Sequence, residues 1–186
     1  MKICIIGLPR CGTTALYFFI RGHLNENYRC ENEPWNKKRY VEFTDECFYK
    51  LVINDTVENQ LVDDETIYDF TYDIINKFDK IIFLRRKNVE GMKNSLAHQL
   101  IYSGFGNEKY RNKFANQYYE KWIPIFEKIS ENKKVYFYED LYTDYVNNDI
   151  LEVCEYIGIK FDKKIWEKYM DIKIRQPYQT KKNILI

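Results

Sequence analysis

The chain has 186 residues, of which 45% are hydrophobic and 31% charged, so we expect one globular domain over residues 1–186. Its 29 basic and 28 acidic residues give a net charge of +1, which argues against a nucleic-acid-coating protein but permits a local basic pocket. The apolar run 15–20 is far too short for a membrane span, and five cysteines without a CxxC pair favour reduced thiols in a soluble, cytoplasmic protein.

The hydrophobic pattern predicts strands that alternate with helices along the chain. Buried strands are expected at 2–6, 48–53, 80–84 and 135–138. Helices are expected at 12–24, 63–78, 88–102, 110–129 and 150–157, with Pro124 kinking or breaking the fourth and Gly158 ending the last. This alternation predicts an α/β three-layer sandwich with a mainly parallel sheet, which binds ligands at the carboxyl ends of its strands.

The first predicted strand ends in a loop with the spacing of the phosphate loop GxxxxGK[ST]. Residues 7–14 read Gly-Leu-Pro-Arg-Cys-Gly-Thr-Thr, so Thr13 stands where the lysine belongs, which counts against an NTP-binding loop. Backbone N–H groups at the helix start, the hydroxyls of Thr13 and Thr14, and the charge of Arg10 favour a P-loop-like anion site. The structural alternative is a tight strand–helix turn without a ligand.

Residues 9–14 resemble the 5′-phosphosulfate loop of sulfotransferases, usually Pro-(Lys/Arg)-Ser-Gly-Thr-(Thr/Ser). These enzymes transfer a sulfonate group from 3′-phosphoadenosine 5′-phosphosulfate (PAPS). The resemblance implies that the 5′ end of PAPS is held by Pro9, Arg10, Cys11, Gly12, Thr13 and Thr14. Cys11 replaces the usual serine, which removes one hydroxyl donor and keeps the backbone donors.

A second segment resembles the family's 3′-phosphate site, where an arginine at a strand end and a serine in the next helix hold that phosphate. Here Arg85 and Arg86 follow a predicted strand, and Ser95 lies in the next predicted helix. A guanidinium fork and a hydroxyl suit a phosphate dianion, and we prefer Arg86 to Arg85. The alternative is a basic strand end beside an N-capping Asn88. The sequence of this segment resembles most closely that of bacterial carbohydrate-modifying sulfotransferases.

A third segment, Tyr-Glu-Asp-Leu at 138–141, resembles the family's late strand and implies that Tyr138 lies near the adenosine. Glu139 and Asp140 are expected to cap the following helix. The basic segment 173–176 resembles the C-terminal segment that closes over the 3′ end of the cofactor, which makes Arg175 a further candidate for cofactor binding.

Sulfonate transfer needs a base that removes the proton of the acceptor. The predicted strand at 48–53 lacks the histidine that many small-molecule sulfotransferases carry there. Carbohydrate-directed relatives use a glutamate in a Glu-Pro segment, and here this resemblance implies Glu33, followed by Pro34, with Glu31 as second choice. The alternative for this segment is an exposed turn. We do not expect His23 or His98 to be the base.

Taken together, the resemblance implies in-line transfer of a sulfonate from PAPS to a hydroxyl of a carbohydrate or another small molecule. Glu33 and Arg10 are the expected catalytic residues, no metal is expected, and the product is 3′-phosphoadenosine 5′-phosphate. The protein is expected to be a monomer or homodimer. Two alternatives stay open: a small phosphate-loop nucleotide kinase, and a catalytically silent nucleotide-binding protein.

Overall fold

A computed structural model describes residues 1–32, 43–53, 73, 75–102, 104, 106–143 and 146–169. Within them, five parallel strands form one sheet in the order β2-β3-β1-β4-β5. The strands are β1 (Lys2–Gly7), β2 (Arg29–Asn32), β3 (Cys47–Val52), β4 (Lys80–Arg85) and β5 (Val135–Phe137). The predicted α/β class is confirmed, and the described sheet is wholly rather than mainly parallel.

β1 lies at the centre of the sheet because its residues are apolar on both faces. Ile3, Ile5 and Ile6 have no exposed surface, and a strand covered on both faces reads as a continuous hydrophobic run. In the register of the sheet, Ile5 pairs with Lys50 on β3 and with Ile82 on β4. The neighbour on β3 is therefore a charged residue inside a buried strand.

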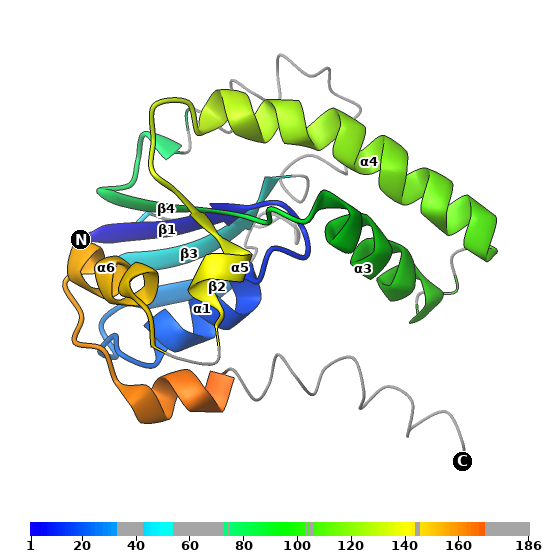
Figure 1. Cartoon of the computed structure of the whole chain (residues 1–186). Coiled ribbons are helices and arrows are strands. Elements are labelled where there is room, and N and C mark those ends of the chain that lie inside the picture. The colour runs from blue at the N-terminus through cyan, green and yellow to red at the C-terminus, as the bar shows by residue number, and fades with distance from the viewer. Residues whose placement is uncertain are drawn as a thin grey trace.

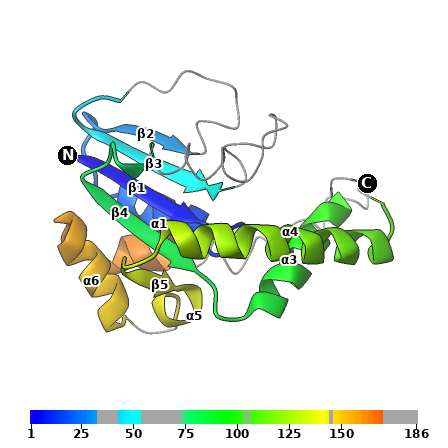
Figure 2. The ribbon, with the colours of Figure 1, turned by 90° about the horizontal axis from the view of Figure 1, so that it is seen from above.

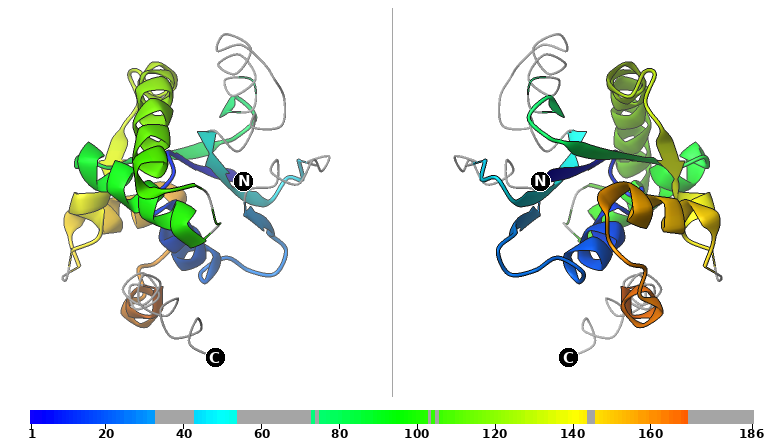
Figure 3. Two further views of the ribbon diagram at one scale, coloured as in Figure 1. Left: turned by 90° about the vertical axis from the view of Figure 1, so that its right-hand side faces the viewer. Right: turned by 90° about the vertical axis from the view of Figure 1, so that its left-hand side faces the viewer.

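Helices lie on both faces of the sheet, as Figures 1 and 3 show. They are α1 (Thr13–Arg21), α3 (Val89–Tyr102), α4 (Glu108–Ile129), α5 (Tyr138–Leu141) and α6 (Asn148–Ile157), and residues 163–169 are also helical. On one face, Tyr17 of α1 stacks on Phe48 of β3, with ring centroids 4.9 Å apart. On the other face, Phe126 of α4 meets Phe83 of β4 edge-on at 6.1 Å.

Many of the 17 tyrosines and 12 phenylalanines pack in and around the core. The ring of Tyr142 stacks on Trp166 with an interplanar angle of 3°, and Phe19 meets Trp166 edge-on. Through these contacts the helical segment 163–169 packs against α1 and the chain after α5. Aromatic pairs add about 0.5–1.5 kcal/mol each beyond the area that they bury.

Two predicted helix ends are confirmed by their caps. The Asn88 side chain accepts a hydrogen bond from the Gly91 N–H at 2.7 Å, which caps the start of α3. Gly158 ends α6 in the left-handed conformation, with φ 77°. The predicted break at Pro124 is wrong, because α4 runs through it. Pro124 is exposed, so the carbonyl that loses its helical donor can be hydrated.

Other elements differ from the prediction. β2 was not predicted because only one of its four residues is apolar and it lies at the sheet edge. The last strand ends at Phe137 because Tyr138 begins α5. The predicted helix at 63–78 lies mostly outside the described residues. In the part of the chain that is described, no helix is both long and apolar enough to cross a bilayer.

Candidate functional site

The predicted cofactor-binding residues that the structure describes lie where the carboxyl ends of β1, β4 and β5 meet. Residues 8–12 join β1 to α1, and α3 and α5 begin shortly after β4 and β5 (Figure 1). Seen from above in Figure 2, α3 and the first half of α4 extend beyond these strand ends. The topology of the sheet therefore gathers segments that are up to 130 residues apart in the sequence.

The loop after β1 has an unusual backbone. Arg10 has φ 65° and Gly12 has φ 81°, both in the left-handed region. A residue with a side chain rarely adopts this conformation, and where it does the surrounding structure must impose it. Gly7 has no room for a side chain, because a Cβ there would lie 2.5 Å from the Thr13 Cγ2. The loop is thus shaped by close packing against the strand end.

The Arg10 guanidinium contacts neutral groups. Its Nε donates to the Ser95 Oγ at 2.8 Å and its Nη1 to the Gln99 Oε1 at 3.4 Å. No carboxylate among the described residues forms an ion pair with it. Burial lowers the pKa of Arg10, and Arg86 nearby lowers it further, whereas Tyr119 opposes both effects. Arginine stays protonated under such perturbations, so the loop carries a charge that no described carboxylate neutralises.

Arg86 and Arg85 point to different neighbours. Arg86 lies over the ring of Tyr138, 4.5 Å from its centroid, and its Nε is 3.3 Å from the Glu139 Oε1. Arg85 instead pairs with Glu127 of α4 at 2.6 Å. The structure therefore brings Arg86, not Arg85, close to Tyr138 and to the loop after β1.

Cys11 turns its side chain into the core. It is fully buried, and its thiol donates to the Met92 Sδ at 3.3 Å. Burial raises the pKa of the Cys11 thiol to about 12, although the Arg86 charge and the backbone N–H groups of Leu8 and Arg86 lower it. Because the whole residue is buried, the thiol is a packing group in this loop.

Lys50 is a site residue that the sequence reasoning missed. It projects from β3, has only 1% of its surface exposed, and its Nζ donates to the Thr14 Oγ1 at 2.9 Å. Thr13, which precedes Thr14 in the chain, is also buried. A lysine inside an otherwise buried strand is the signal that could have identified it, because a charge is costly to bury unless it is paired or hydrogen bonded.

Glu139 stabilises the start of α3 rather than the helix that follows it. Its carboxylate accepts hydrogen bonds from the N–H groups of Lys87 and Asn88, at 2.8 and 3.1 Å, and Asp140 pairs with the Lys87 Nζ. Burial acts to raise the pKa of Glu139, but these backbone donors and Arg86 hold it below its ordinary value. Glu139 and Asp140 were expected to cap the following helix. In the structure they instead contact the segment before α3.

A pH dependence follows from this environment. A carboxylate whose pKa is lower in the folded protein than in the unfolded chain stabilises the fold at a pH above the unfolded-state pKa, which is about 4.3 for glutamate. This contribution is lost as the pH falls through the folded-state pKa. We expect Glu139→Gln to lower the melting temperature at pH 7, with a gap to wild type that narrows below about pH 4. Thermal unfolding between pH 3 and 7 measures it, with the exposed Glu155→Gln as control. A gap that stays constant or widens in acid would contradict the expectation.

Two glycines with similar backbones provide a matched pair. A Cβ on Gly12 would lie 2.6 Å from the Tyr142 ring and 2.8 Å from the Tyr138 ring, whereas nothing lies within 4 Å of one on Gly158. We expect Gly158→Ala to cost about 1 kcal/mol of unfolding free energy for its positive φ. Gly12→Ala should cost about 1–3 kcal/mol more, because the added methyl group overpacks the site. Urea denaturation compares the two, and equal losses would show that the rings move aside freely.

Three predicted or alternative site residues need separate mention. Glu33 and Arg175 lie outside the described residues. Glu31 lies in β2 at the sheet edge and pairs with Arg29 at 2.8 Å. The structure thus brings together the predicted residues of three segments: Pro9, Arg10, Cys11, Gly12, Thr13 and Thr14 with Arg86, Ser95 and Tyr138.

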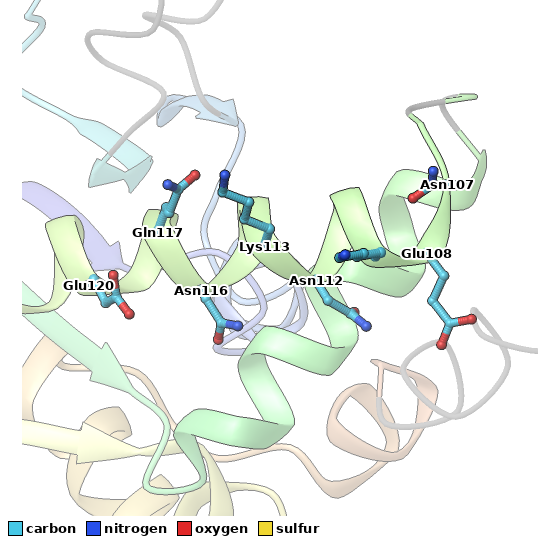
Figure 4. Close-up of a pocket in the computed structure, with 8 residues that line it drawn as sticks. Asn107, Glu108, Asn112, Lys113, Asn116, Gln117 and Glu120 are labelled. Carbon is cyan, nitrogen blue, oxygen red and sulfur yellow. The ribbon is translucent and has the colours of Figure 1, made fainter.

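Two hollows lie away from this cluster. One, of about 960 Å³, follows the polar side of α4 shown in Figure 4, and its described lining comes from that helix and its N-cap residue Asn107. Its lining includes Asn112, Asn116 and Glu120. The other, of about 550 Å³, lies near the amino ends of β4 and β5 beside Tyr136 and Glu152. Neither contains a predicted site residue. Among the described residues, no group of three or more His, Cys, Asp or Glu is placed to hold a metal ion.

The fold and the cluster define an α/β chain with cationic groups at the carboxyl ends of a parallel sheet. Comparison with protein-family models, with curated proteins and with solved structures gave no match. The function must therefore be inferred from the residues of this chain.

Proposed function

We propose that the chain is a PAPS-dependent sulfotransferase that transfers a sulfonate group to an acceptor hydroxyl. The observation that carries the proposal is that Arg86 lies close to Arg10 in the loop after β1, while Lys50 of β3 contacts Thr14 where the same loop enters α1. The charge of Arg86 acts to lower the pKa of Arg10, and Arg10 contacts only neutral oxygens among the described residues. A ligand with two anionic ends would relieve this repulsion, and PAPS and its product have such ends.

Each residue has a chemical role in the proposal. Glu33 takes the acceptor proton as the acceptor oxygen forms its bond to sulfur and the bond from sulfur to the 5′-phosphate oxygen breaks. Arg10, Thr13, Thr14 and Lys50 stabilise the charge that develops on the departing phosphate and on the sulfonate oxygens. Arg86 and Ser95 hold the 3′-phosphate.

A nucleotide kinase is the second candidate, and Lys50 favours it. Thr13 stands where a kinase loop has its lysine, but the Lys50 amine reaches the neighbouring Thr14 hydroxyl from β3. An amine at that place could contact a nucleotide phosphate as well as a sulfonate. The two functions differ in whether the 3′-phosphate of the ligand is recognised.

Calorimetry with 3′-phosphoadenosine 5′-phosphate, ATP and AMP separates these candidates. We expect the 3′,5′-bisphosphate to bind most tightly, because Arg86 recognises its 3′-phosphate. Tighter binding of ATP would overturn the proposal in favour of a kinase. Turnover of radiolabelled PAPS across a panel of hydroxylated acceptors then separates a transferase from a catalytically silent binding protein.

A further inference from the structure

Two tyrosine hydroxyls hold the carbonyl groups of the loop after β1. Tyr119 of α4 donates to the Pro9 carbonyl at 2.9 Å, and Tyr142, just after α5, donates to the Gly12 carbonyl at 2.6 Å. The two tyrosines are far from the loop in sequence, by 110 and 130 residues, and both are buried. They approach from different elements and fix both ends of the segment that contains Arg10.

The direction of a carbonyl fixes the direction of the N–H in the same peptide. Peptide units are planar, and in a trans peptide the N–H points opposite to the C=O. The structure has no cis peptide bond among its described residues. With the Pro9 carbonyl turned to Tyr119, the Arg10 N–H points away from α4. With the Gly12 carbonyl held at the first turn of α1, the Thr13 N–H points out of the helix N-terminus, where anions bind.

Both hydroxyls remain donors over the working pH range. Burial raises the pKa of Tyr119 above its ordinary value, and the thiol of Cys11 adds to this, whereas Arg10 and Arg86 oppose it. Burial also raises the pKa of Tyr142, while the Leu16 backbone N–H lowers it. The loop is therefore anchored by neutral groups that leave its positive charge intact.

We propose that Tyr119 and Tyr142 are positioning residues, which hold two peptide planes so that the backbone N–H groups of the loop face the 5′ group of the ligand. This inference rests on the proposed function, because it assigns the tyrosines to the 5′ end of the same nucleotide. The two hydroxyls act through the backbone and contact no ligand atom themselves. Removing either hydroxyl should therefore weaken the binding only of ligands that carry a 5′-phosphate.

The test compares two ligands and three variants. Tyr119→Phe and Tyr142→Phe keep the ring and remove the hydroxyl. Tyr136→Phe is the matched control, because the Tyr136 hydroxyl is also buried but lies 3.3 Å from Glu152 at the other end of the sheet. Calorimetry gives the affinities for 3′-phosphoadenosine 5′-phosphate and for adenosine 3′-monophosphate, which lacks the 5′-phosphate. Thermal unfolding monitors the fold of each variant.

The relevant ratio is the affinity for 3′-phosphoadenosine 5′-phosphate divided by that for adenosine 3′-monophosphate. We expect this ratio to fall about tenfold in Tyr119→Phe and in Tyr142→Phe, because each variant loses the equivalent of roughly one well-placed hydrogen bond to the 5′-phosphate. Tyr136→Phe should leave the ratio unchanged. An unchanged ratio in both test variants, or equal losses for both ligands, would overturn the positioning role and leave the proposed function intact. A wild-type protein that does not prefer the bisphosphate would overturn the proposed function first. If one variant fails to unfold cooperatively, the other decides.

Discussion

Replacing Arg86 with alanine is expected to weaken the binding of 3′-phosphoadenosine 5′-phosphate by about 100-fold, because a charge-assisted hydrogen bond to phosphate contributes about 1.5–3 kcal/mol. Its guanidinium lies over the Tyr138 ring at 4.5 Å, which holds a planar donor next to the place proposed for the adenosine. The loss should be specific to the 3′-phosphate, so the affinity for adenosine 5′-monophosphate should change little. Isothermal calorimetry on both ligands measures the difference.

Arg85→Ala is the matched control for this experiment. The two arginines are adjacent, but Arg85 pairs with Glu127 on α4, whereas Arg86 lies over the Tyr138 ring. Its removal should leave both affinities within about twofold of wild type, since a surface ion pair contributes little. If Arg85→Ala gave the large loss and Arg86→Ala did not, the assignment of the 3′-phosphate site would have to be exchanged. Equal losses for both ligands in Arg86→Ala would contradict a role in 3′-phosphate recognition.

The sequence predicted the central strands well because their signal is local. β1 and β4 are short apolar runs flanked by turn residues, and the structure confirms both to within a residue or two. β2 could not be predicted in this way, because the reason that Arg29–Asn32 forms a strand is its pairing with β3. An edge strand of mixed polarity depends on its partner, which a hydrophobic pattern does not show.

For the candidate site, the sequence predicted residues but not their contacts. Arg10 and Ser95 were assigned to opposite ends of the nucleotide, yet in the structure they are hydrogen bonded to each other at 2.8 Å. The proposed ligand must therefore displace or share this bond. Chain order alone could not show it, since the contact joins residues 85 positions apart.

Lys50 and the two anchoring tyrosines were missed for a related reason. Their side chains matter through what they touch, and Tyr119 and Tyr142 reach the loop only after the chain has folded. The chain has 17 tyrosines and 12 phenylalanines, and the structure shows two uses for such residues. Some of these rings pack the core, and two present hydroxyl groups to the backbone of the loop.

Replacing Lys50 with methionine is expected to weaken the binding of ligands that carry a 5′-phosphate by about 100-fold. In a buried site, solvent screens the attraction between an amine and a bound anion only slightly. Methionine has a similar length and no charge, so it keeps most of the packing inside β3. The affinity for adenosine 3′-monophosphate should change much less, since Lys50 reaches the start of α1 through Thr14. Calorimetry on the two ligands measures this contrast.

Lys80→Met is the matched control, because Lys80 begins the neighbouring strand β4 at its amino end, where its amine lies over the Tyr156 ring. It should leave both affinities unchanged. Thr14→Val removes only the hydroxyl that Lys50 contacts, and it should give a smaller loss of about tenfold. A cooperative unfolding transition in each variant ensures that the folded protein is compared. Full affinity for the bisphosphate in Lys50→Met would show that this buried lysine is a structural residue and would remove it from the proposed mechanism.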